Sequence, residues 1–251
     1  MNKSLNAILA LAALIAGAAS LLDVAAPTLL DAGASRASAA GEARPQPVAA
    51  ANPAVSRQSL TPQPPTTTVP HLTDLKLIRV PLARQATDFT CGAAALQSVL
   101  GFYGQDVREQ ELARNLGSNS YDGTNFRRIM KYAREHGYQA AVKTPMTLDE
   151  LKQKLDEHVP VICLIQAWSG HKDTDYAHDW NDGHYVVAVG YDQDNVYFMD
   201  PSTLGNYTYI PTHEFTQRWH DREQHTRLPQ LGLWITKPSP PYSPDAILKM
   251  D

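Results

Sequence analysis

Cys91 stands in the sequence context that a nucleophilic thiol needs. It follows a polar loop and opens a run whose apolar residues recur at helical spacing, namely Ala95, Leu96, Val99, Leu100 and Tyr103. We therefore expect its sulfur at the N-terminus of a helix, where free backbone N–H groups and the helix dipole stabilise an anion. Because the thiolate is the reactive form of cysteine, this position favours nucleophilic chemistry.

Two neighbouring residues support this interpretation. Gly92 lets the backbone approach a ligand closely, since it has no side chain in the way. Gln85 lies upstream on a loop that can bring its amide beside the sulfur. Most cysteines, however, are buried and inert, so a reactive Cys91 requires partners elsewhere in the chain.

Cys163 has the opposite context. It lies within residues 160–165, a continuous apolar run typical of a central strand buried on both faces. Burial raises the pKa of a thiol, so we expect Cys163 to be inert. Two cysteines are too few for a disulfide framework, and a single bridge between them would consume the candidate nucleophile.

A histidine and an aspartate are predicted to meet at one end of a β-hairpin. The apolar pattern predicts strands at 183–191 and 196–199, and Pro201 ends the second strand. His184 begins the first strand and Asp200 ends its antiparallel partner, so the carboxylate can orient the imidazole. A thiol catalyst needs such a base and such an orienting group. Each residue is a weak signal alone, and the combination with Cys91 carries the prediction.

The elements that would position these residues fall into two groups. Besides the Cys91 helix, helices are predicted at 107–116, 125–136, from the capping box of Thr147 and Glu150, and at 212–219. Strands are predicted at 75–82, 138–142, 160–165, 207–210 and 231–236, in addition to the hairpin. A mostly helical first half followed by a mostly stranded second half predicts an α+β fold.

The order Gln85, Cys91, His184, Asp200 resembles the papain-like cysteine peptidases. The local sequences Cys91-Gly-Ala-Ala-Ala-Leu, Gly183-His-Tyr-Val-Val and Met199-Asp-Pro are similar to those of the bacteriocin-leader-processing peptidases and their secreted, stand-alone relatives. The likeness extends over residues 75–237. It implies a papain-like fold, with an N-terminal helical half packed on a C-terminal antiparallel sheet.

The resemblance also implies roles for these residues. Cys91 would be the nucleophile and His184 the general base and acid, with Asp200 orienting His184. Gln85 and the backbone N–H of Cys91 would form the oxyanion hole, and Gly183 would lie beside the substrate. The processing peptidases are commonly fused to a transporter with an ATPase. This sequence has neither a transmembrane bundle nor a G-x-x-x-x-G-K phosphate loop, so ATP is not expected here.

An acidic loop with several aromatic residues precedes His184. We expect Trp168 and Trp180 to form a wall of the cleft and to offer flat surfaces to the substrate. Residues 171–182 also carry histidine and aspartate side chains that suit zinc or calcium, which makes this loop the alternative metal site. Because the spacing matches no established ligand pattern, we expect no metal and no cofactor.

The N-terminus is typical of an export signal. Lys3 precedes an apolar stretch at 7–19, and small-residue cleavage sites follow at 16–18 and 37–39. The stretch is short compared with the about 20 residues of a transmembrane helix, although an uncleaved signal anchor is the alternative. Either way, we expect the bulk of the chain to be periplasmic or secreted, with membrane attachment only through that anchor.

The segments predicted along the chain are a signal peptide or anchor at 1–39, a Pro/Ala-rich linker at 40–71, a peptidase domain at 72–238 and a tail at 239–251. A net charge of −4 without any Lys/Arg-rich block argues against a nucleic-acid partner.

These features predict a cysteine peptidase that hydrolyses peptide bonds through an acyl-thioester, with a peptide or protein as its substrate. The same triad could instead transfer the acyl group to an amine, as in transglutaminase-like chemistry. A catalytically silent peptide-binding module is the alternative from another class. Its signature would be a missing triad member, and none is missing.

Overall fold

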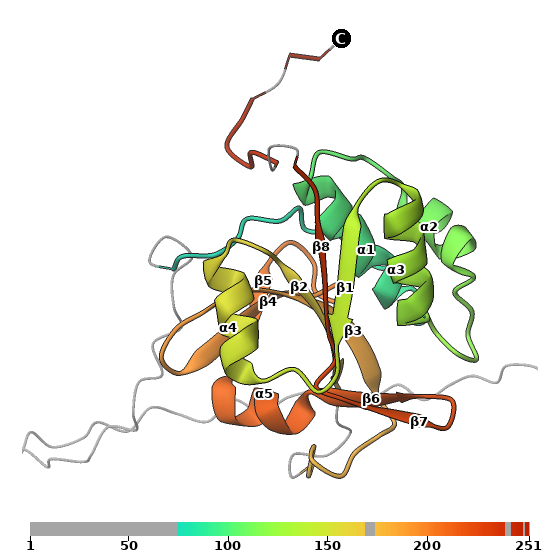
Figure 1. Ribbon diagram of the computed structural model, residues 1–251, viewed down its shortest axis with the longest axis vertical. Coiled ribbons are helices and arrows are strands. Elements are labelled where there is room, and N and C mark those ends of the chain that lie inside the picture. The colour runs from blue at the N-terminus through green and yellow to red at the C-terminus, as the bar shows by residue number, and fades with distance from the viewer. Residues whose placement is uncertain (1–74, 169–173, 239–241, 248, 251) are drawn as a thin grey trace, which may run out of the picture. The chain divides into compact units, whose positions relative to one another are not determined.

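The computed structural model describes residues 75–168, 174–238, 242–247 and 249–250 (Figure 1). The expected signal and linker segments lie outside the described residues. Within the described part of the chain, none of the helices has the length and apolar character needed to cross a bilayer.

The first half of the described chain is mostly helical, as predicted. It contains α1 (Cys91–Phe102), α2 (Glu109–Leu116), α3 (Phe126–Glu135), β1 (Gln139–Lys143) and α4 (Leu148–Asp156). The second half is mostly stranded and contains β2 (Val161–Gln166), β3 (Gly183–Tyr191), β4 (Asn195–Met199), β5 (Tyr207–Pro211), α5 (Thr212–Arg218), β6 (His220–Glu223), β7 (Thr226–Pro229) and β8 (Gly232–Thr236). The α+β prediction is confirmed.

Local sequence signals explain where several helices begin and end. Asn125 caps α3 by accepting a hydrogen bond from the N–H of Arg127. Thr147 and Glu150 form the predicted capping box at the start of α4. Gly117 follows α2 with a φ of 61°, the left-handed conformation that ends a helix and that glycine adopts without strain.

The strands form a sheet of order β1-β8-β2-β3-β4-β5, in which every neighbouring pair is antiparallel. The hairpin β6–β7 forms a separate small sheet. Strand β2 lies inside the larger sheet and all its residues are buried, as its continuous apolar run predicted.

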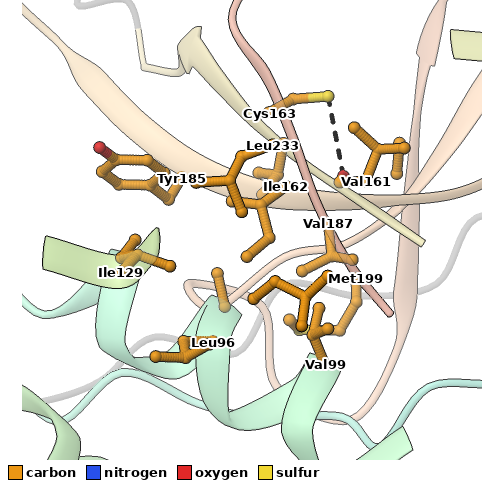
Figure 2. Packing of buried hydrophobic residues seen from close by; sticks show 14 of the residues in the cluster. Leu96, Val99, Ile129, Val161, Ile162, Cys163, Tyr185, Val187, Met199 and Leu233 are labelled. Carbon is orange, nitrogen blue, oxygen red and sulfur yellow. Dashed lines mark hydrogen bonds between the residues drawn. The ribbon is translucent and has the colours of Figure 1, made fainter. Parts of the chain in front are cut away.

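The hydrophobic core lies between α1 and the sheet. Figure 1 shows α1, α2 and α3 gathered on one side of the sheet and α4 on the other. In Figure 2, Leu96 and Val99 of α1 point toward Ile162, Val187 and Met199 of the sheet, and all five side chains are almost fully buried. This packing fixes the N-terminus of α1 relative to the start of β3, which is where the candidate site lies.

One predicted strand is absent, and one hairpin was not predicted. The strand predicted at 75–82 is absent: the segment is extended but donates only one hydrogen bond to β3, from Ile78 N to Val189 O at 2.7 Å. β2 and β4 pair with the two edges of β3, and the single bond to this segment is accepted by Val189, which lies at the irregularity in the β3–β4 pairing. The hairpin β6–β7 was not predicted, because its residues His220–Pro229 are mostly polar and lack a clear apolar alternation.

Candidate active site

Cys91 is the first residue of α1, as predicted, and is 7% exposed. Thr90 precedes it as the N-cap residue, and its hydroxyl group is tied into the preceding loop through hydrogen bonds with Thr87 rather than to the helix. The first N–H groups of α1 therefore have no side-chain cap and point toward the region of the sulfur. An anion at this place is favoured by the helix dipole.

Gly92 makes room for the loop before α3. A Cβ at this position would lie 2.7 Å from Cβ of Thr124, which is far too close for two carbon atoms. The loop before α3 therefore approaches the Gly92 backbone closely. Thr124 is buried and hydrogen-bonds Ser118 at 2.7 Å, so it cannot move aside easily.

His184 and Asp200 lie where the hairpin prediction placed them. His184 is the second residue of β3, and Asp200 follows the last residue of β4. The imidazole Nε2 is 2.8 Å from Oδ1 of Asp200, and the two side chains are 2% and 17% exposed. A buried histidine is thus held by a mostly buried carboxylate.

Asp200 is held in turn by two hydroxyl groups. Its Oδ1 accepts hydrogen bonds from the N–H and the hydroxyl of Ser202, each at 2.8 Å. Its Oδ2 accepts from the hydroxyls of Ser202 at 2.9 Å and Thr203 at 3.0 Å. Burial by itself would raise the pKa of Asp200, but the hydrogen bonds and the charge of His184 outweigh it and lower the pKa to about 2.

The ionised Asp200 decides which nitrogen of His184 can act as a base. A carboxylate only accepts hydrogen bonds, so Nε2 must carry a proton, and in the neutral ring Nδ1 is the free base. Nδ1 is buried and makes no hydrogen bond of standard geometry within the described residues. Burial lowers the pKa of His184, but interactions with Asp200 and with the nearby Cys91 sulfur raise it to about 9. Protonated His184 therefore suits a thiolate partner.

The loop that carries Gln85 is held by hydrogen bonds to the residue after Asp200 and to the first residue of α2. The backbone N–H of Gln85 donates to the carbonyl of Pro201 at 3.0 Å, next to Asp200. The following N–H, of Ala86, donates to the carboxylate of Glu109 at 3.1 Å. The Gln85 amide nitrogen donates to the Thr87 carbonyl at 2.8 Å, which leaves its second N–H for another acceptor.

The two tryptophans expected in the cleft wall are in different places. The Trp168 ring packs on the His184 ring with centroids 4.7 Å apart, and the side chain is 48% exposed. Trp180 instead packs on His220, with centroids 4.3 Å apart, and carries Arg227 over its ring. Only Trp168 contacts the candidate triad.

Gly183, which we expect beside the substrate, lies against the carboxylate of Asp221. A Cβ on Gly183 would be 2.0 Å from Oδ2 of Asp221. A side chain at position 183 would therefore displace the Asp221 carboxylate. Sequence reasoning did not find Asp221, because it lies on the hairpin that was not predicted.

Cys163 lies in the core, as predicted. It is fully buried, its sulfur is 3.8 Å from the carbonyl of Val161, and burial raises the pKa of its thiol. Both cysteines are free, so the bridge that would have consumed the nucleophile is not formed. In the loop considered for metal binding, His178 pairs with Asp175 at 2.7 Å, and no group of three metal-ligating side chains occurs among the described residues.

Ser202 and Thr203 are site residues that sequence reasoning missed. Their signal was present, because hydroxyl residues two and three positions after an aspartate commonly hydrogen-bond its carboxylate in a turn.

Comparison with known proteins places the chain in a family. The model of the Peptidase_C39 like family matches residues 77–226, more than half of the chain. The chain therefore belongs to this family and is a cysteine peptidase, as the resemblance implied. The match spans the four motif residues from Gln85 to Asp200.

A curated relative is the transport/processing ATP-binding protein ComA of Streptococcus pneumoniae strain R6. It is 29% identical over 164 residues, which cover 64% of this chain and 19% of ComA. This chain thus spans about a fifth of the length of the curated relative that it matches.

Solved structures of the same kind also match. A double glycine motif protease from an AMS/PCAT transporter, crystallised with its leader peptide, is 25% identical, with a TM-score of 0.45 and coverage of 63% of this chain and 92% of that chain. A C39-like peptidase from Bacillus anthracis is 19% identical, with a TM-score of 0.49 and coverage of 66% and 98%.

Proposed function

We propose that this chain hydrolyses peptide bonds through an acyl-thioester on Cys91. The observation that carries the proposal is the buried His184–Asp200 pair at 2.8 Å, with the Cys91 sulfur near enough to raise the pKa of His184. In a family of cysteine peptidases, this is the arrangement of base, orienting group and nucleophile that thiol catalysis requires.

In the first half of the reaction, the Cys91 thiolate attacks the peptide carbonyl carbon. The negative charge moves to the carbonyl oxygen, where the N–H of Cys91 and the free N–H of the Gln85 amide can donate to it. When the C–N bond breaks, the leaving amine takes the proton from Nδ1 of His184. The products are a free amine and an acyl-thioester on Cys91.

In the second half, water replaces the amine. Neutral His184 takes a proton from the water through Nδ1, and the oxygen attacks the thioester carbonyl. The carbon–sulfur bond breaks, a carboxylic acid leaves, and the thiolate and protonated His184 are restored. Asp200 stays ionised throughout and holds the imidazole through Nε2, as its low pKa requires.

The test replaces each cysteine in turn. We expect Cys91→Ala to lose both peptide cleavage and labelling by iodoacetamide, whereas Cys163→Ala keeps both, because Cys163 is fully buried. Labelled peptides are mapped by mass spectrometry, and cleavage is followed on unfolded protein substrates. Cleavage retained by Cys91→Ala would exclude this nucleophile.

Product analysis distinguishes the hydrolase from the two alternative functions. If an added primary amine becomes joined to the acyl fragment in preference to water, the enzyme is an acyl transferase rather than a hydrolase. If substrate binds but Cys91 is never acylated, the chain is a silent peptide-binding module. We expect the free acid as the main product.

We also propose that the peptidase acts outside the cytoplasm. The support is the sequence alone: Lys3 followed by the apolar stretch at 7–19 and small-residue cleavage sites. Fractionation of cells that produce the full chain, with N-terminal sequencing of the mature protein, tests the export and shows whether the signal is removed. Full-length protein in the cytoplasm would contradict it.

A further inference from the structure

The loop that carries Gln85 has little packing to hold it in place. Residues 86–88 are exposed, and Gln85 itself is only half-buried. A donor to the carbonyl oxygen of a substrate must nevertheless be fixed before the reaction, since its contribution depends on its position. The hydrogen bonds that this loop makes with its surroundings must therefore determine where the Gln85 amide lies.

One group of hydrogen bonds decides how the Gln85 amide is turned. Its nitrogen donates to the carbonyl of Thr87 at 2.8 Å, and its Oε1 is buried and accepts no hydrogen bond within the described residues. A carbonyl only accepts, so the NH2 group must face Thr87, and its second N–H remains for an acceptor outside the loop. Thr87 is held in turn by the hydroxyl of Thr90, which accepts from the Thr87 N–H at 3.2 Å. The amide is thus oriented by its own loop.

The residue between Gln85 and Thr87 is held by another element. The N–H of Ala86 donates to Oε1 of Glu109, the first residue of α2, at 3.1 Å. Glu109 is 8% exposed, and a carboxylate is rarely buried to this extent unless it is hydrogen-bonded. The first turn of α2 favours its negative charge, and a charged acceptor makes a stronger hydrogen bond than a neutral one. Glu109 therefore ties the loop firmly to α2.

The turn after Asp200 holds the other side of the loop. The N–H of Gln85 donates to the carbonyl of Pro201 at 3.0 Å, and the Arg84 guanidinium donates to the carbonyl of Ser202 at 2.8 Å. Both peptide groups that flank the Gln85 Cα are therefore anchored, one by Pro201 and the other by Glu109. Together these two anchors fix the direction in which the Gln85 side chain leaves the backbone.

We propose that Glu109 is a positioning residue for catalysis, which fixes the Gln85 amide as an oxyanion donor by holding the Ala86 N–H. This inference rests on the proposed function and adds a residue to it. Without the Glu109 carboxylate, the Ala86 N–H would turn to water, and the peptide group between Gln85 and Ala86 could rotate. The amide would then donate poorly to the oxyanion, although Cys91 and His184 would be unchanged.

The first experiment is steady-state kinetics on the full chain. We expect Glu109→Ala to lower kcat about tenfold or more with little change in KM, because the oxyanion forms only in the transition state. Glu109→Gln keeps an acceptor oxygen and should restore most of the activity. The control Glu111→Ala removes a charge from an exposed side chain in the same turn of α2 and should behave as the native chain. Native activity in Glu109→Ala, or a glutamine variant as impaired as the alanine variant, overturns the proposal.

A double variant separates positioning from a general loss of structure. Gln85→Ala should lower kcat on the order of a hundredfold, and Glu109→Ala should add no further loss to it, because Glu109 acts through Gln85. Labelling of Cys91 by iodoacetamide should keep its native rate in Glu109→Ala, since alkylation of the sulfur forms no oxyanion. Losses of kcat that multiply in the double variant, or labelling that falls together with turnover, contradict the positioning role.

A third measurement needs no turnover. NMR relaxation of the isotope-labelled Gln85 side-chain amide reports how firmly the amide is held. We expect its order parameter to fall in Glu109→Ala and to stay at the native value in Glu111→Ala. An unchanged order parameter in Glu109→Ala overturns the positioning role even if the chain hydrolyses peptides. A lowered order parameter in a protein whose native form has no turnover supports the role of Glu109 and refutes the hydrolase.

Discussion

Asp200 and Asp221 both lie against the first residues of β3, yet their surroundings push their pKa values in opposite directions. Asp200 accepts hydrogen bonds from His184, Ser202 and Thr203, and its pKa falls to about 2. At Asp221, burial raises the pKa to about 6, and the hydrogen bonds from the N–H of Arg222 and from Gln166 offset it only in part. Burial acts on both carboxylates, so the number of donors that stabilise the charged form decides the outcome.

The difference shows which carboxylate is held in its ionised form. A carboxylate that holds a catalytic imidazole must stay ionised and must not move, and the donors around Asp200 secure both. Asp221 has fewer donors, so its ionised form lowers the stability of the folded protein above about pH 6.

The largest expected effect is the loss of catalysis when Asp200 is replaced. Asp200→Ala should lower kcat/KM on the order of a hundredfold or more, because His184 loses the group that fixes its tautomer and stabilises its cation. Asp221→Asn removes the other carboxylate beside β3 and should lower kcat/KM far less, because Asp221 makes no hydrogen bond to His184. Steady-state kinetics on one peptide substrate measures both variants. An equal loss in the two variants would contradict the special role of Asp200.

The next effect concerns the histidine that Asp200 holds. The pKa of about 9 of His184 depends on both Asp200 and Cys91, so Cys91→Ala should lower it, and the imidazolium should be lost at a lower pH. NMR titration of the histidine ring protons measures the shift, with Cys163→Ala as the control that should leave it unchanged. In the native enzyme, activity should fall as pH rises through about 9, because the leaving amine then lacks its proton donor. An unchanged titration in Cys91→Ala would show that the sulfur does not act on His184.

The smallest effect is on stability, where the two carboxylates should differ in sign. The lowered pKa of Asp200 stabilises the fold above its ordinary pKa, and this contribution is lost as pH falls toward 2, so Asp200→Asn should lower the Tm at pH 8. The raised pKa of Asp221 makes its ionised form unfavourable above about pH 6.

Asp221→Asn should therefore raise the free energy of unfolding at pH 8 by on the order of 1–3 kcal/mol, which raises the Tm by a few degrees. The gain should vanish below the ordinary pKa of aspartate. Thermal melts of both variants at pH 8 and at acid pH measure this. A lower Tm for Asp221→Asn at pH 8 would show that the charge is satisfied within the protein.

Much of the fold could be predicted because its elements carry strong local signals. The helices α1 to α4 have apolar spacing, caps or a terminating glycine, and β2 is a buried apolar run. The segment at 75–82 has the alternation of a strand, but β2 and β4 pair with β3, and the segment donates only one hydrogen bond to it. Pairing depends on which edge is free, which no local pattern records.

The sequence by itself determined the parts of the site that local order governs. Cys91 at a helix start follows from the spacing of the apolar residues after it, and the meeting of His184 and Asp200 follows from the antiparallel pairing of adjacent strands. These relations involve neighbours along the chain or one hairpin, so residue types and spacing are sufficient to predict them.

Only the tertiary structure decided what surrounds those residues. In the folded chain Asp221 of the β6–β7 hairpin lies against Gly183. Thr124 packs against Gly92, and the Trp180 ring packs on His220. These contacts join segments whose own patterns are polar and irregular. They are set by how the helical half and the sheet pack on one core, and that packing is a property of the whole folded chain rather than of any segment in it.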